Sequence, residues 1–224
     1  DFSACQVTDT GGVDDRSFNQ TAYEGLQRAG EELGFDADFL ESQDEADYAP
    51  NIEAFMEQGC DLIITVGFLL GDATAAAAEA NPDQHFAIVD YDFFDADSGE
   101  DVTYDNVREL TFATDQAAFL AGYVAAAMTE TGTVGTYGGL NIPTVTIFMD
   151  GFDAGIDFYN EENGTDVQLV GWDRDTQEGL FTSSFEDQTL GRQTTETLLD
   201  QGADIILPVA GPVGLGSVEA LRAG

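Results

Sequence analysis

The sequence predicts an α/β fold with parallel, doubly wound sheets, and three observations support that class. Apolar runs with the length of strands alternate with helical stretches along almost the whole chain, which is the pattern of repeated strand–helix units. Residues 61–66 (DLIITV) are apolar on both faces, as a strand buried in a parallel sheet should be. The first strand leads through a glycine turn directly into a helix, which is the arrangement of an open α/β sheet with right-handed crossovers.

The elements of the first half follow this alternation without a break. A short apolar segment opens the chain as its first strand, and the third helix is rich in alanine. The expected strands are 4–8, 36–40, 61–66, 86–90, the short strand 102–106, and 132–137. The expected helices are 17–33, 48–58, 71–80 and 114–128.

The best candidate for a domain boundary is residues 138–143 (GGLNIP), because glycine and proline break the pattern there. We therefore expect an N-terminal α/β lobe over residues 1–138 and a second α/β lobe over 139–224. The expected elements of the second lobe are helix 144–162, strand 166–171, helix 187–201, strand 204–209 and a helix from 217. Two clear strands are few for an independent sheet, and the sequence stops inside a helix. The second lobe is thus expected to be truncated, with its remainder supplied by more of the natural chain or by a partner.

The net charge of −38, from 44 acidic residues against six basic ones, all arginine, limits the possible partners. Such a surface repels nucleic acid and anionic membranes, so neither is expected as a partner. Its simplest interpretation is a solvated surface, secreted or adapted to high salt, and the alternative is a dedicated site for a cationic partner. The absence of lysine excludes a Walker loop and Schiff-base catalysis. His85, at the entrance to a strand, is expected to be solvated rather than catalytic.

The two cysteines, Cys5 and Cys60, lie in the first strand and just before the third. These strands are neighbours in a doubly wound sheet, so a disulfide is possible, and we favour it over two buried thiols. No run is long and apolar enough to cross a membrane. The chain begins directly at a strand, so any signal peptide or lipid anchor is expected to be missing from this sequence.

Small or polar residues follow several strands at positions that meet at one rim of a parallel sheet. Asp9, Gly67–Phe68 and Asp90 follow strands of the first half, and Gly211 follows one of the second half. Ligands of open α/β folds bind outside the carboxyl ends of strands, so this recurrence predicts a pocket.

The loop after the first strand offers a carboxylate (Asp9), helix-start N–H groups, an aromatic ring (Phe18) and an amide (Asn19). These groups suit a neutral polar ligand with a flat ring, and the carboxylates would repel a phosphate. Each residue also has a plain structural interpretation. Asp9 could cap a turn, Phe18 could pack into the core, and Asn19 could be a surface amide. Phe185, in an acidic segment, could simply shield a helix start.

One segment closely resembles the opening signature of a known family: Asp9-x-Gly11-Gly12-x-Asp14-Asp15-x-Ser17-Phe18-Asn19-Gln20. That family is the basic membrane protein family, the surface-anchored substrate-binding proteins of ABC transporters, which include purine nucleoside receptors. Further matches span nearly the whole chain: Tyr48-x-Pro50-Asn51, 61–68 (DLIITVGF), Leu120-Ala121-Gly122-Tyr123, Gly135-x-x-Gly138-Gly139-x-x-Ile142-Pro143, Gly151-Phe152-x-Ala154-Gly155, Gln201-Gly202-Ala203-Asp204 and Ala210-Gly211-x-x-Gly214-Leu215-Gly216.

The resemblance implies a two-lobed fold like that of the type I periplasmic binding proteins, with a nucleoside bound in the cleft between the lobes. Two phenylalanine rings sandwich the base in the purine receptors, and the matching positions are Phe18 and Phe185. Asp9 matches a carboxylate that contacts the ligand, and Gly211 matches a backbone contact. The full ligand-binding set expected here is Asp9, Ser17, Phe18, Asn19, Gly67, Phe68, Asp90, Phe185 and Gly211. The family continues with a strand ending in a ligand-binding aspartate and, later, a cleft lysine, and neither lies within these 224 residues.

The resemblance thus implies an extracytoplasmic solute-binding protein, either a cell-surface lipoprotein or periplasmic, that hands a purine nucleoside to an ABC transporter permease. Hinge closure would accompany binding, and no cofactor, metal or catalytic residue is expected. Contact with the membrane is expected only through an N-terminal lipid anchor outside this sequence. Two alternatives remain open. A nucleoside hydrolase could use Asp14 and Asp15 as base and metal ligands, although such a pair more often caps a helix. A ligand-sensing regulator would need DNA-binding residues outside this chain.

Overall fold

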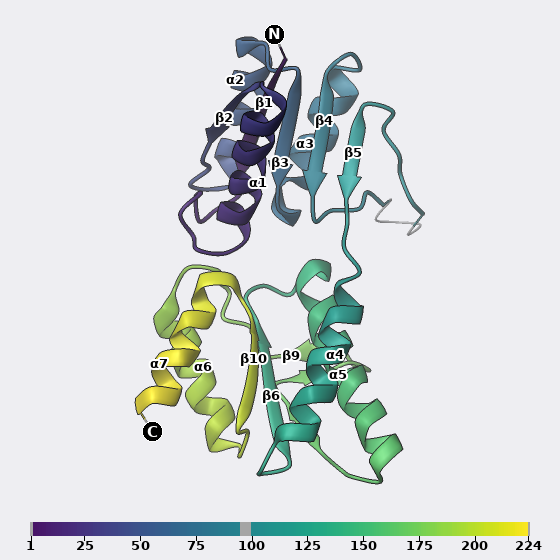
Figure 1. Cartoon of the computed structure of the whole chain (residues 1–224), viewed down its shortest axis with the longest axis vertical. Helices are drawn as coiled ribbons and strands as arrows, with labels where there is room; N and C mark the ends of the chain where they lie inside the picture. Colours follow the sequence, from purple (N-terminus) through teal and green to yellow (C-terminus); the bar gives the residue numbers. More distant parts are fainter. Residues whose placement is uncertain (1, 95–99, 224) are drawn as a thin grey trace. The chain divides into compact units, whose positions relative to one another are not determined.

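The computed structural model describes residues 2–94 and 100–223, and the chain forms two compact units, Asp1–Phe112 and Ala113–Gly224 (Figure 1). Each unit contains a parallel sheet flanked by helices, so the expected α/β class with parallel sheets is confirmed. Within the described residues, the antiparallel pairing of named strands is confined to one short hairpin of the second unit.

The first unit is built on a five-stranded sheet in the order β2-β1-β3-β4-β5. Its strands are β1 (Ser3–Thr8), β2 (Asp36–Leu40), β3 (Leu62–Val66), β4 (His85–Val89) and β5 (Val107–Leu110). Its helices are α1 (Phe18–Leu33), α2 (Tyr48–Gln58) and α3 (Gly71–Ala80), with short 3-10 turns η1 (Glu45–Asp47) and η2 (Phe68–Leu70). Figure 1 shows α1 on one face of this sheet and α2 and α3 on the other.

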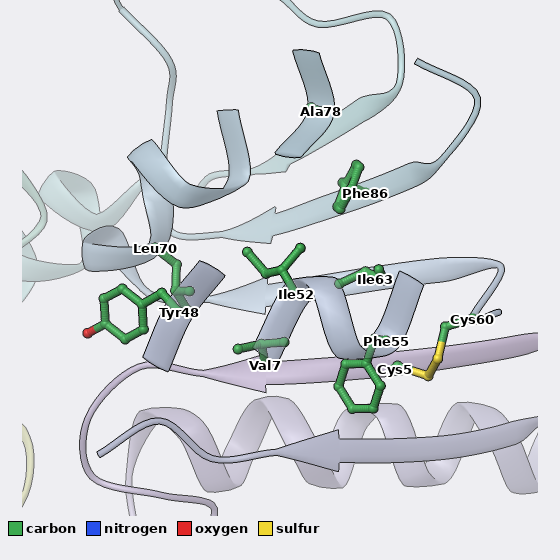
Figure 2. Packing of buried hydrophobic residues seen from close by; sticks show 10 residues of the cluster. All are labelled: Cys5, Val7, Tyr48, Ile52, Phe55, Cys60, Ile63, Leu70, Ala78 and Phe86. Atoms are coloured by element: carbon green, nitrogen blue, oxygen red, sulfur yellow. A yellow bond between two sulfur atoms is a disulfide. The ribbon is translucent and has the colours of Figure 1, made fainter. Parts of the chain in front are cut away.

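The core of the first unit lies between the sheet and the helices α2 and α3. Alternate residues of β1, Cys5 and Val7, pack there against Ile52 and Phe55 of α2 and Ala78 of α3 (Figure 2). Cys5 and Cys60 form a disulfide in this core, with their Cα atoms 6.1 Å apart. The disulfide thus links β1 to the residues that lead into β3, its neighbour in the sheet.

The expected strand 102–106 is wrong, because the strand at this place is β5, which begins at Val107. Asp105 and Asn106 form a turn, closed by a bond from the Val107 N–H to the Tyr104 carbonyl. The Asn106 amide also donates to the carbonyls of Ala78, Asn81 and Gln84, and so ties the turn to the end of α3. Asn and Asp favour such turns through side-chain bonds to backbone, which explains why pairing starts only after them.

The chain divides earlier than the sequence pattern predicts, after Phe112 rather than after Gly138. The strand β6 (Thr133–Gly138) pairs with later strands, and the helix α4 (Thr114–Met128) packs along the later helix α5 (Pro143–Asn163). Both elements therefore belong to the second unit. The glycine- and proline-containing stretch at 138–143 is the loop that joins β6 to α5, and it is not a linker between units.

The second unit has a three-stranded parallel sheet in the order β10-β6-β7. Its remaining elements are β7 (Gln168–Val170), β8 (Trp172–Asp173), β9 (Glu178–Gly179), α6 (Gln188–Asp200), β10 (Ile205–Val209), η3 (Gly211–Gly214) and α7 (Leu215–Ala223). Glycines let α4 and α5 approach closely, since a Cβ at Gly122 would collide with the Phe152 carbonyl and one at Gly155 with the Phe119 carbonyl. β6 gives this sheet a third strand. The boundary predicted at 138–143 had placed this strand in the first lobe.

The hairpin of β8 and β9, which the sequence pattern did not predict, is tied to α5 by polar side chains. The Trp172 indole N–H and the Gln177 amide donate to Asp150 Oδ1 at 2.9 and 3.0 Å. Arg174 in the hairpin turn lies 2.7 Å from Asp157 Oδ2 and 3.5 Å from Asp153 Oδ2. Strands of only two residues are too short to show the alternation of apolar and polar residues by which a strand is predicted. The turn between them is held by Asp173, whose carboxylate accepts hydrogen bonds from the Asp175 and Thr176 N–H groups.

We expect Asp153→Asn to stabilise the second unit at pH 7.5. Burial, followed by the nearby charge of Asp157, raises the pKa of the Asp153 carboxyl to about 6, although Arg174 opposes the shift. Because the folded-state pKa lies above the ordinary value, the stabilisation from this group is complete below about pH 4 and is lost as the pH rises through 6. The variant should therefore melt a few degrees higher than wild type at pH 7.5 and equally at pH 3.5, as measured by thermal unfolding.

The matched control for this variant is Asp157→Asn, which removes the closer and more exposed partner of Arg174 and, with it, the charge that repels the Asp153 carboxylate. Because these two effects oppose each other, it should bring a smaller gain at pH 7.5 than Asp153→Asn. If Asp153→Asn instead melts below wild type at pH 7.5, the ion pair with Arg174 outweighs the burial of the carboxylate.

Candidate functional site

Three of the expected ligand-binding residues meet at the carboxyl edge of the first sheet. Asp9, Gly67 and Asp90 directly follow the adjacent strands β1, β3 and β4. Each continues the backbone ladder by one bond, from Asp9 N to Val66 O at 3.2 Å, from Gly67 N to Val89 O at 3.1 Å, and from Asp90 N to Leu110 O at 3.0 Å. The structure therefore brings these residues to one edge, where open parallel sheets bind ligands.

Asp9 is held between Asn19 and Gly67. The Asn19 Nδ2 donates to Asp9 Oδ1 at 2.9 Å and to the Thr10 carbonyl at 3.3 Å. On the other side, Gly67 has a φ of +112°, and a Cβ there would lie 2.7 Å from Asp9 Cγ. Glycine is required at 67 for both reasons, because the backbone is left-handed and the carboxylate fills the space of a side chain.

The start of α1 is capped by Asp15, which corrects the expectation that its N–H groups are open to a ligand. The Asp15 carboxylate accepts from the backbone N–H groups of Ser17, Asn19 and Gln20, at 2.8, 3.0 and 3.1 Å. Ser17 is the N-cap residue by position but makes no side-chain cap. A carboxylate already occupies the positive end of this helix, so the end is closed to a second anion.

Aromatic residues follow three of these strands, β1, β3 and β4. Phe18, the first residue of α1, is 37% exposed, so it does not pack into the core. Phe68 opens η2 after β3 and is half-buried, with its ring 4.9 Å from that of Tyr91. Tyr91 in turn covers Gly71 at the start of α3, where a Cβ would meet its ring.

Two further residues of this region, Tyr91 and Tyr48, are not among those predicted from the sequence. Tyr91 directly follows Asp90 at the end of β4, a position that could have suggested it. Tyr48 begins α2 and is buried; burial and then the charge of Asp9 raise the pKa of Tyr48 to about 12, so its hydroxyl stays protonated close to that carboxylate. Its place in the motif Tyr48-x-Pro50-Asn51 was the available signal.

Asp90 has two unusual features for a residue at a strand end. Its φ is +63°, a left-handed conformation that is uncommon outside glycine and concentrates at functional sites. Burial raises the pKa of the Asp90 carboxyl above its usual range. Arg16 in the loop before α1 and Ser183 in the loop before α6 share the left-handed conformation, with φ of +55° and +57°.

Phe185 and Gly211 occupy the corresponding edge of the second sheet. The Phe185 ring covers Gly139, which follows β6, because a Cβ at 139 would lie 2.5 Å from its Cδ1. The ring is partly buried against Val145 and Met149. Gly211 follows β10, the partner of β6, and is exposed with a φ of +52°. Both positions thus lie where the strands of their own unit end.

The groups that the sequence offered for metal binding or catalysis can be placed in the fold. Residues 2–94 and 100–223 hold no group of three His, Cys, Asp or Glu side chains placed to bind a metal ion. Of the pair considered for a hydrolase, Asp15 is engaged as the helix cap and Asp14 is exposed. His85 opens β4 and is exposed to solvent.

Comparison with known proteins decides the family. A sequence model described as "ABC transporter substrate-binding protein PnrA-like" matches residues 2–223, almost the whole chain. The chain belongs to this Bmp family. Among its relatives, the ABC transporter nucleoside-binding protein BmpA of Lactococcus lactis is 35% identical over 227 residues, covering 100% of the chain and 59% of the relative. Basic membrane protein A of Borreliella burgdorferi is 31% identical over 212 residues, covering 95% of the chain and 57% of the relative.

A solved structure agrees with the Bmp assignment. The ABC transporter solute-binding protein of Aeropyrum pernix K1 superposes with a TM-score of 0.85 at 33% identity, covering 100% of the chain and 59% of that protein. The chain therefore spans a little over half of the length of these Bmp relatives. The helices within the described residues are each too short or too polar to span a bilayer.

Proposed function

We propose that this Bmp-family chain binds a purine nucleoside at the carboxyl edges of its sheets and delivers it to an ABC transporter permease. The observation that carries the proposal is the exposed ring of Phe18 at the start of α1, next in sequence to Asn19, whose amide fixes the Asp9 carboxylate. A purine offers a flat face that can stack on the ring, and a nucleoside offers N–H or O–H donors that the carboxylate can accept. The name of the Lactococcus lactis relative, a nucleoside-binding protein, supports the same ligand class.

In this proposal Ser17, Phe18, Phe68 and Asp90 also contact the ligand at the edge of the first sheet. The family resemblance extends the proposed ligand-binding set to Phe185 and Gly211. The half-buried Phe185 retains part of its ring for contact with a base. The protein acts by binding alone, without chemistry on the nucleoside: of the pair considered for a hydrolase, Asp15 is engaged in capping α1. The Cys5–Cys60 disulfide supports an extracytoplasmic location, at the cell surface or in a periplasm.

Ligand-induced thermal stabilisation of the intact protein tests the ligand class. Guanosine, inosine and adenosine should each raise the melting temperature, because a ligand that binds only the folded state stabilises it. Cytidine should stabilise less, since its smaller ring stacks on less area, and ribose should have no effect. Equal stabilisation by ribose and guanosine would contradict a site built on stacking.

Guanosine monophosphate should bind at least about tenfold more weakly than guanosine. The carboxyl edge of the first sheet presents Asp9 and Asp90, and the helix end beside it is already capped by Asp15. A dianionic phosphate near such carboxylates loses more than about 1 kcal/mol in partly screened surroundings. Calorimetry at low ionic strength checks this expectation, with 5′-O-methylguanosine as the neutral control for size. If guanosine monophosphate binds as tightly as guanosine, its phosphate must lie beside a cationic group, and the proposal of a neutral nucleoside as ligand is refuted.

A further inference from the structure

A seam of buried polar side chains lies between β1 and α1. Cys5 and Val7 face α2, so the alternate residues Gln6 and Thr8 face the α1 side of the sheet, and both are 0% exposed. Asn19, in the first turn of α1, is 2% exposed. Four polar atoms of this seam have no hydrogen-bond partner within the described residues: Gln6 Nε2, Gln6 Oε1, Thr8 Oγ1 and Asn19 Oδ1. Buried polar atoms without partners are costly, so apolar residues would give a more stable fold here.

The Asn19 Nδ2 is the exception in this seam, because it does have partners. It donates to Asp9 Oδ1 at 2.9 Å and to the Thr10 carbonyl at 3.3 Å. Both partners are acceptors, which fixes the orientation of the amide with Nδ2 toward Asp9. The Asn19 backbone is anchored as well, since its N–H donates to Asp15 Oδ2 at 3.0 Å. The amide is therefore held in place on both its backbone and its side chain.

We propose that Asn19 is a positioning residue, which acts on the ligand through Asp9. Its side-chain amide donates to Oδ1 of the Asp9 carboxylate, while Oδ2 lies against Gly67. Asp9 therefore accepts a hydrogen bond from the ligand in one fixed direction. A donor to a carboxylate makes a charge-assisted bond, which is stronger than a neutral one. This role is added to the direct ligand contact expected from the sequence, and it uses the bonded Nδ2 of a side chain that is only 2% exposed. The inference rests on the proposed function, since it takes Asp9 as a ligand contact.

A double-mutant cycle on guanosine affinity tests the inference. Asn19→Leu, an apolar side chain of similar size, should weaken binding about tenfold in the wild-type background. In the background of Asp9→Ala, the same substitution should have no further effect, because the group through which Asn19 acts is gone. Asn19→Ala serves as a second variant should leucine disturb the packing of α1. If the two losses multiply in the double variant, Asn19 acts independently of Asp9 and the inference is overturned.

Two further measurements separate the possible failures. Asn106→Leu removes an asparagine of purely structural role, whose amide donates to three carbonyls, so it should lower the melting temperature and leave affinity unchanged. Without ligand, the Asn19 side-chain amide resonances should shift in Asp9→Ala and stay in place in Asp14→Ala. If wild type fails to bind guanosine, the proposed function falls, and with it the role toward the ligand. If guanosine binds to wild type and the Asn19 amide resonances do not shift in Asp9→Ala, the positioning role alone is refuted.

Discussion

Replacing Phe18 with alanine should weaken purine nucleoside binding by roughly 10- to 100-fold, since stacking of a base on an aromatic ring contributes about 1–3 kcal/mol. The ring is 37% exposed and lies outside the buried clusters of the described residues, so its loss should leave the melting temperature nearly unchanged. Calorimetric titration of wild type and variant with guanosine measures the first effect, and thermal unfolding without ligand measures the second.

The matched control is Phe2→Ala, which removes another exposed phenylalanine of the same unit. Phe2 is 50% exposed and packs edge-on against Phe35, away from the carboxyl edge of the sheet. Its removal should not change guanosine affinity, and Phe18→Tyr should retain most of it because the stacking face is kept. A variant Phe18→Ala that binds normally but melts early would assign the ring to packing, which is the structural alternative for this residue.

Removing the disulfide should be the most damaging change to the stability of the first unit. Cys5 and Cys60 are 55 residues apart in sequence, and a closed loop of that length corresponds to about 4 kcal/mol of unfolding free energy in the chain-entropy account. Both half-cystines are buried in the core beside Phe55 and Ile63, so reduction also frees two groups in a tightly packed region. We expect Cys5→Ala with Cys60→Ala, or reduction of wild type, to lower the stability of this unit alone.

Urea unfolding can assign the loss to one unit. The single tryptophan, Trp172, belongs to the second unit, so its fluorescence follows that unit, while circular dichroism follows both. The dichroism curve should gain an early transition in the double variant, and the fluorescence midpoint should stay in place. An unchanged dichroism curve under reducing conditions would contradict the stabilising role of the disulfide.

The sequence was sufficient for the fold class and for the edge that carries the candidate site. The buried run at 61–66 became the central strand β3, and the polar residues Asp9, Gly67 and Asp90 do follow adjacent strands. Strand ends of a parallel sheet meet at one edge by geometry, so local sequence is enough to predict this grouping.

The boundary between the units was not predictable from composition. The chain passes from one unit to the other at Phe112 and Ala113, where neither glycine nor proline marks the change. Glycine instead gathers at 138 and 139, because the rings of Phe181 and Phe185, respectively, leave no room for side chains there. A glycine-rich loop at a strand end and a linker have the same composition, and only strand pairing distinguishes them.

The roles within the first loop also depend on contacts that a sequence does not reveal. Asp14 and Asp15 are equivalent by type, yet only Asp15 reaches the N–H groups of α1. Asn19 could be a surface amide by its position, and its burial against β1 is known only from the fold. Asp9 gains its fixed geometry from two residues distant in sequence from each other, Asn19 and Gly67.

Titration calorimetry of the intact protein with guanosine tests the central claim most directly. The account predicts saturable binding of one nucleoside per chain, with a dissociation constant of about 1 μM or below and a negative heat-capacity change from burial of the base. The same titration of Phe18→Ala should show the loss of affinity that places the base on this ring. An absence of heat with guanosine, inosine and adenosine up to about 1 mM would contradict the account.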